Sequence, residues 1–214
     1  MIPGSANPLL LASAEADAYE IERSLRFNSS DSAYLSRTPS VAGNRKTWTW
    51  AGWVKRSNLG GWNVLFGASN GDALRYDANN TDKISFNNSG TALLITPAVY
   101  RDTSAWYHIV CSVNTTLSSN RVKLYVNGEL ATQGDPYIQN EDTPFNATAE
   151  HNIGRNPGTT TRLFDGYLAD IHFIDGQALD PSSFGDFDTN GVWQPKAYAG
   201  SYGTNGFHLP FSDN

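Results

Sequence analysis

The segment VKLYVNGEL, residues 122–130, decides the fold class. Residues 121–126 and 129–132 are two short runs that favour strands, and Asn127-Gly128 stands between them. These two residues accept the positive φ angles that a type I′ turn requires. The segment therefore predicts an antiparallel β-hairpin.

Further short strands are expected on both sides of this hairpin. They are separated by turn-forming pairs such as Asn70-Gly71, and a meander with this spacing is typical of antiparallel sheets. We find no amphipathic helix of three turns, so the sequence predicts an all-β protein built as a sandwich. The expected strands cover residues 23–27, 47–55, 62–66, 73–76, 83–86, 92–95, 106–113, 167–174 and 207–209.

Two of these strands make specific predictions about their faces. In 47–55, Trp48 and Trp50 share one face and are expected in the core, whereas Trp53 faces the other way, either under a neighbouring segment or toward a partner. In 167–174, strict alternation places Asp170 on the same face as His172 and Leu168.

The amino-acid composition disfavours several classes of function. Of 214 residues, 39% are hydrophobic and 12% aromatic, enough for one globular core. A formal charge of −6 and a pI near 5.1 disfavour nucleic-acid binding, which draws on clustered Lys and Arg. No run approaches the roughly 18 apolar residues of a spanning helix, so no membrane insertion is expected. The single Cys111 lies in an apolar run and is predicted to be buried.

We expect three segments. Residues 1–22 mix Pro, Gly, Ala and acids without a period and are predicted to be an N-terminal arm. Residues 23–184 form the sandwich domain. Residues 185–214, rich in Gly and aromatic residues, are a C-terminal segment that packs on the domain or on a neighbouring subunit.

Four signatures in a fixed order carry a family resemblance: WYHIV at 106–110, LYVNG at 124–128, Ile153-Gly154, and FDGYLADI at 164–171. In this order they resemble the concanavalin A-like jelly-roll superfamily, in particular its laminin-G-like and pentraxin-like members. The resemblance covers roughly residues 23–184. It implies an antiparallel jelly-roll β-sandwich, here with extended N- and C-terminal arms.

Three other stretches are similar to virion proteins of tailed bacteriophages. They are IPGSANP at 2–8, the block from Ser24 to Arg56, and FHLPFSDN at 207–214. The resemblance implies a lectin-like tail fibre, tail appendage or capsid decoration. Its expected partners are other virion proteins, sister subunits in a homo-oligomer and a host surface glycan, and its expected location is the virion.

Catalysis is not expected. Family 16 glycoside hydrolases of this superfamily place their carboxylates on alternate residues of one strand, and the nearest pair here, Glu20 and Glu22, lies in the arm with no Asp between them. No nucleophile elbow is present. His108 is expected to be a packed strand residue, and the four histidines lack zinc-ligand spacing.

No cofactor is expected, and calcium is the one metal ion for which the sequence offers candidate ligands. In pentraxin-like members, acidic calcium ligands follow the equivalent of Ile153-Gly154, but this chain has Arg155, Asn156 and Pro157 there. The long loop 134–150 offers other oxygen ligands, with a solvated acidic loop as the alternative. These candidates are Asp135, Asn140, Glu141 and Asp142.

Glycan binding is the main alternative to a purely architectural role for the domain. Lectins stack a sugar on an aromatic ring and hold its hydroxyls with polar groups. Aromatic residues outside the expected core are Trp62, Tyr137, Trp193, Tyr198 and Tyr202, although residues 193–202 suit a tail packed on an adjacent subunit equally well. We therefore expect a non-enzymatic virion component that binds host glycans, with a free, soluble or secreted lectin as the alternative.

Overall fold

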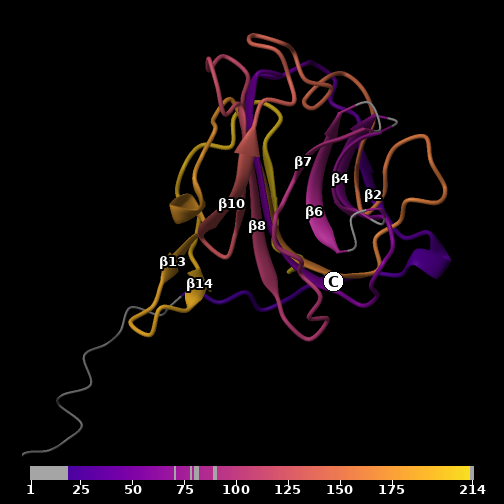
Figure 1. Ribbon diagram of the computed structural model, residues 1–214, viewed down its shortest axis with the longest axis vertical. Coiled ribbons are helices and arrows are strands. Elements are labelled where there is room, and N and C mark those ends of the chain that lie inside the picture. Colours follow the sequence, from indigo (N-terminus) through magenta and orange to yellow (C-terminus); the bar gives the residue numbers. More distant parts are fainter. Residues whose placement is uncertain (1–18, 70, 78, 80–81, 89–90, 213–214) are drawn as a thin grey trace, which may run out of the picture.

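The computed structural model describes residues 19–212 except 70, 78, 80–81 and 89–90, and consists of two facing antiparallel sheets (Figure 1). The first sheet has the strand order β1-β12-β3-β8-β9-β10, and β15 also pairs with β12. Its strands are β1 (Leu25–Phe27), β3 (Thr47–Arg56), β8 (Tyr107–Asn114), β9 (Val122–Val126), β10 (Glu129–Gly134), β12 (Gly166–Asp175) and β15 (Phe207–Leu209). Residues 1–18 of the expected arm lie outside the described part.

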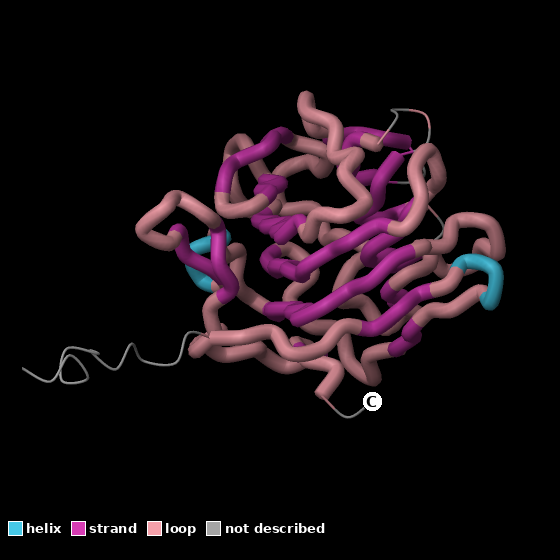
Figure 2. The backbone as a smooth tube through the Cα atoms, turned by 90° about the horizontal axis from the view of Figure 1, so that it is seen from below, coloured by secondary structure: helices cyan, strands magenta, loops and turns pink. Residues whose placement is uncertain are grey.

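The second sheet has six strands in the order β2-β11-β4-β5-β6-β7. These are β2 (Leu35–Arg37), β4 (Asn63–Ser69), β5 (Asp72–Asp77), β6 (Lys83–Asn88), β7 (Thr91–Ile95) and β11 (His151–Ile153). Viewed from below, the strands of the two sheets form two layers joined by loops (Figure 2). The antiparallel sandwich expected from the sequence is confirmed.

The core lies between the sheets and is rich in aromatic rings. Trp48, Trp50 and Val54 of β3 point into it, as predicted, and the Trp48 ring lies 4.7 Å from that of Phe145. Cys111 is buried there as well. The predicted hairpin is also confirmed, since Asn127 and Gly128 have φ angles of 48° and 83° between β9 and β10.

Strict alternation along β12 is wrong. Leu168, Ile171 and Phe173 all lie in the core, while Asp170 and His172 interact with groups on the outer face. A bulge explains this, because the pairing register with β3 shifts between Ala169 and His172. One extra residue there lets Ala169 and Asp170 both face outward.

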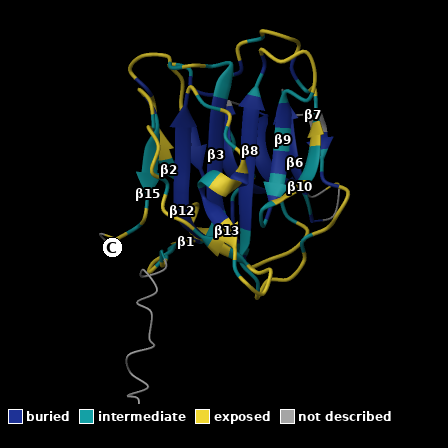
Figure 3. Ribbon diagram, turned by 90° about the vertical axis from the view of Figure 1, so that its left-hand side faces the viewer, coloured by how far each residue is buried: buried dark blue, intermediate teal, exposed yellow. Residues whose placement is uncertain are grey.

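The C-terminal segment packs on the domain itself. After a 3₁₀ turn, η3 (Pro181–Ser183), β13 (Gly185–Phe187) and β14 (Trp193–Pro195) form a separate hairpin. Figure 3 looks onto the outer face of the seven-stranded sheet and shows this hairpin lying across it. The second short turn, η2 (Ser29–Asp31), follows β1. Among the described residues, neither helical turn is long and apolar enough to cross a membrane.

Candidate functional site

A large concavity lies on the outer face of the seven-stranded sheet. It is a cleft of about 1040 Å³ between the N-terminal residues 19–24 and the β13–β14 hairpin. The sheet contributes its floor through Trp53 of β3 and Ala169 of β12, and Asn127 comes from the β9–β10 turn. We call it the three-tryptophan cleft, after Trp53, Trp106 and Trp193.

All three tryptophans are partly exposed and line the cleft. Trp53 packs on His108 at 5.1 Å between ring centroids, and Trp193 stacks on the same imidazole at 5.9 Å. Trp106 precedes β8, and Phe187, 46% exposed, continues the apolar lining from β13. A cleft with several aromatic faces suits a ligand that has flat apolar faces of its own.

Trp193 is held in a fixed position. Its indole N–H donates to His108 Nδ1 at 3.1 Å, and burial lowers the pKa of His108 to about 3, so the imidazole stays neutral and accepts this hydrogen bond. Two glycines leave room for the ring, since a Cβ at Gly128 or at Gly185 would lie 2.4 Å from it. The ring is therefore positioned before a ligand arrives.

Polar groups surround the aromatic floor. Glu20, Glu22 and Arg23 line the cleft from the N-terminal segment, and Gln194 lines it from β14. Asn127 is fixed because its side-chain oxygen accepts the backbone N–H of His108 at 2.8 Å. The cleft thus offers carboxylates, amides and a guanidinium around stacking surfaces, a combination that suits a polyhydroxylated ligand.

The five aromatic residues predicted to bind glycan do not lie together in the structure. Trp193 lines the cleft, whereas Tyr198 and Tyr202 pack nearby against Phe184 and His172. Tyr137 is 2% exposed and packs on Phe86 in the core, so its ring is not available to stack on a sugar, and this expectation is corrected.

Trp62 is partly exposed and lies outside the cleft, immediately before β4 of the six-stranded sheet. Its ring lies 4.2 Å from the guanidinium carbon of Arg75 and 5.4 Å from that of Arg162. This tryptophan is therefore engaged by two cations, and it belongs to a different surface from Trp193.

The four oxygen ligands proposed for calcium do not form one group of acidic ligands among the described residues. Asp135 pairs with Arg121 at 2.7 Å, and Asp142 lies 3.9 Å from both Arg45 and Lys46. Glu141 accepts the backbone N–H of Ile138, and the Asn140 N–H donates to the Thr115 carbonyl. The three carboxylates therefore have partners within the protein, and these contacts together with the Asn140 backbone hydrogen bond hold the 134–150 loop in place.

Sequence reasoning missed Trp53 and Trp106 as candidate site residues. The sequence allows Trp53 to be either buried or exposed, and in the structure it is half-buried in the floor of the cleft. Trp106 was included in an expected strand that in fact begins at Tyr107. Trp53 lies on the face of β3 opposite the core residues Trp48 and Trp50, and this position in the sequence could have marked it as a surface aromatic residue.

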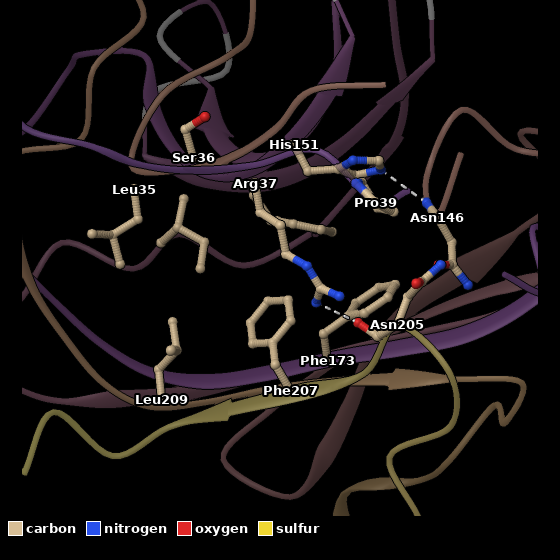
Figure 4. Close-up of a pocket in the computed structure, with 12 residues that line it drawn as sticks. Leu35, Ser36, Arg37, Pro39, Asn146, His151, Phe173, Asn205, Phe207 and Leu209 are labelled. Carbon is tan, nitrogen blue, oxygen red and sulfur yellow. Dashed lines mark hydrogen bonds between the residues drawn. The ribbon is translucent and has the colours of Figure 1, made fainter. Parts of the chain in front are cut away.

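A second, smaller cavity of about 220 Å³ opens between the edges of the two sheets (Figure 4). Phe66, Phe173, Phe207 and other apolar side chains line it. The polar groups at its edge are already paired: Arg37 donates to the Asn205 carbonyl at 2.7 Å, and His151 Nε2 accepts the backbone N–H of Asn146 at 2.9 Å. It lacks the mixture of stacking faces and polar groups that the cleft offers.

Comparison with known proteins defines the class. The family model Laminin_G_3, described as the concanavalin A-like lectin/glucanases superfamily, matches residues 27–183. The chain belongs to this superfamily. No curated protein matches it.

Solved structures are similar at low sequence identity. A candidate carbohydrate-binding protein of Bacteroides ovatus is 15% identical with a TM-score of 0.54, over 79% of this chain and 50% of that one. A heptameric SAP-like pentraxin of Limulus polyphemus is 15% identical with a TM-score of 0.51, over 76% and 80%. Domain 4 of an extracellular GH43 arabinanase of Geobacillus stearothermophilus is 23% identical with a TM-score of 0.48, over 67% and 66%. The chain spans half the length of the Bacteroides ovatus protein, and the likeness concerns the fold.

Proposed function

We propose that this protein is a non-enzymatic glycan-binding component of a tailed-phage virion, with the three-tryptophan cleft as its binding site. The observation that carries the proposal is the joint presence of Trp53, Trp106 and Trp193 with carboxylate and amide groups in one cleft. The C–H faces of a sugar ring stack on indole, and its hydroxyls bond to carboxylates and amides.

Display of many copies of the protein on a virion would strengthen binding at such a site. A shallow cleft that binds one sugar segment weakly gains strongly when many copies are displayed together, because later binding events are intramolecular. The virion assignment rests on the sequence resemblance of residues 2–8, 24–56 and 207–214 to tailed-phage proteins. A free lectin with the same cleft is the alternative.

Binding is tested on an array of bacterial surface polysaccharides, followed by calorimetry with the glycan that binds. Trp106→Ala is expected to weaken binding about 30-fold or more, because truncating a tryptophan that lines a binding site costs about 2 kcal/mol or more. Trp62→Ala is the matched control, since it removes a partly exposed tryptophan on another surface. Equal losses in both variants would place the site elsewhere.

Two further measurements separate the alternatives. Mass spectrometry of purified phage particles detects this chain if it is a virion component and misses it if it is a free lectin. Incubation of the bound glycan with the protein, followed by chromatography, is expected to show no shortened product. Cleavage that disappears in Glu20→Gln or Glu22→Gln would make the cleft an active site instead.

A further inference from the structure

Two histidines and one aspartate meet on the outer face of the seven-stranded sheet. Asp170 and His172 belong to β12 and His208 belongs to β15, and one ligand-type atom from each lies within 4.8 Å of the others. Asp170 Oδ1 is 2.6 Å from His208 Nε2, and Oδ2 is 3.3 Å from His172 Nε2. The described residues contain no other such group of three.

The backbone is distorted where it supplies the carboxylate. Asp170 has a φ of 49°, a left-handed conformation that residues with a Cβ seldom adopt, and it lies in the β12 bulge. The bulge turns Asp170 to the outer face, toward His172 and His208. Strain of this kind persists where the surroundings enforce it, and it is concentrated at functional sites.

His172 has a ring nitrogen without a hydrogen bond. Its side chain is 2% exposed, and Nε2 is not aligned to donate to Asp170. Its other nitrogen, Nδ1, lies 2.9 Å from the Tyr202 hydroxyl. In the tautomer in which Nδ1 donates to that hydroxyl, Nε2 presents its lone pair to the cluster, as a metal-ligating histidine does.

We propose that Asp170, His172 and His208 bind a divalent transition-metal ion of the Zn²⁺ type. Two imidazole nitrogens and one carboxylate oxygen are a ligand set that suits such an ion and leaves a coordination position open. The two imidazole rings are stacked 4.3 Å apart at 6°, and the lone pair of a ring nitrogen lies in the plane of its ring. To bind the same ion as His172, the His208 side chain, which is 30% exposed, would therefore have to rotate out of this stack.

The cluster lies next to the N-terminal wall of the three-tryptophan cleft. The Tyr19 hydroxyl donates to Asp170 Oδ1 at 2.8 Å, and residues 19–24 form one wall of the three-tryptophan cleft. Metal binding at this cluster does not require that the cleft bind a glycan.

The test is a metal titration of the whole chain after treatment with a chelator. Calorimetry with Zn²⁺ is expected to give one equivalent bound, and Co²⁺ is expected to develop visible d–d absorption that Zn²⁺ displaces. His208→Gln is expected to lower Zn²⁺ affinity by more than about 100-fold. Tyr202→Phe, which removes the partner of the other His172 nitrogen, is expected to lower it roughly 10–100-fold.

Asp142→Asn is the matched control, because it removes a carboxylate of the 134–150 loop that is 53% exposed. It is expected to leave Zn²⁺ affinity unchanged. Asp170 is buried and its replacement risks unfolding, so the decision rests on the natural chain and on His208→Gln, each checked by circular dichroism. Absence of Zn²⁺ and Co²⁺ binding by the natural chain, or equal affinity in His208→Gln, overturns the proposal.

Discussion

At the scale of single residues, Gly128 links the central hairpin to the three-tryptophan cleft. Its φ of 83° closes the turn between β9 and β10, and its missing side chain leaves space for the Trp193 ring. Gly128→Ala is expected to cost about 1–2 kcal/mol of unfolding free energy from the backbone alone. It should also displace Trp193, so glycan binding falls as well. Urea unfolding and calorimetry measure the two effects.

Gly176→Ala separates these two effects of the Gly128 substitution. Gly176 also has a positive φ, 90°, but a Cβ there would meet no atom within 4 Å. This control therefore carries the backbone cost without a clash, and it should bind glycan normally. If both variants retain binding, the position of Trp193 does not matter for the site.

At the scale of elements, an ion pair joins the two sheets at one end of the sandwich. Arg56 at the end of β3 pairs with Asp82, just before β6, at 2.9 Å, and both side chains are buried. The same guanidinium lies 4.0 Å from the ring of Tyr76 in β5. Asp82→Ala leaves a buried, unpaired cation, so we expect a loss of about 3–5 kcal/mol in urea unfolding.

Asp142→Ala serves as the comparison for Asp82→Ala. Its carboxylate lies 3.9 Å from Arg45 and Lys46 and is 53% exposed, so water already screens these pairs. We expect its unfolding free energy to change by less than about 0.5 kcal/mol. A similarly small change in Asp82→Ala would mean that the Arg56 pair contributes little to joining the sheets.

The elements also show which features follow from sequence and which do not. The Asn127-Gly128 turn and the inward face of Trp48 and Trp50 follow from local chemistry, because turn geometry and the period of a strand are local properties. The β12 bulge does not, because pairing with β3 decides where the extra residue falls. The separation of His172 and His208 in the sequence does not indicate a metal site, because the two side chains come together only when β15 pairs with β12 after a long connection.

At the scale of the whole molecule, the cleft is a product of distant segments. Tyr19, Trp53, Trp106 and Trp193 line one space although they are spread over most of the chain. Sequence predicted Trp193 as a candidate but could not select it from the other aromatic residues, since Tyr137 and Trp193 differ in burial and not in local pattern. The sheet provides the floor, and the two terminal segments provide the walls.

The buried histidines make the stability of the whole fold dependent on pH. Burial lowers the pKa of His108 to about 3 and also lowers that of His151, whereas in the unfolded chain each titrates near 6.5. Below pH 6.5 the unfolded state therefore binds protons that the folded state does not. The stability that His108 contributes is complete above this pH and falls by about 1.4 kcal/mol per pH unit as the pH decreases toward 3, and His151 adds to the loss in the same direction.

Urea unfolding at pH 7, 5.5 and 4.5 measures this slope, and His108→Gln identifies its source. Gln does not titrate, and its side-chain oxygen can still accept the Trp193 N–H. The variant is therefore expected to be less stable than the natural chain at pH 7, because it loses ring packing with Trp53 and Trp193, but to lose less stability on acidification. A natural chain equally stable at pH 7 and 5.5 would contradict the prediction, because neither His108 nor His151 could then have a lowered pKa in the folded state.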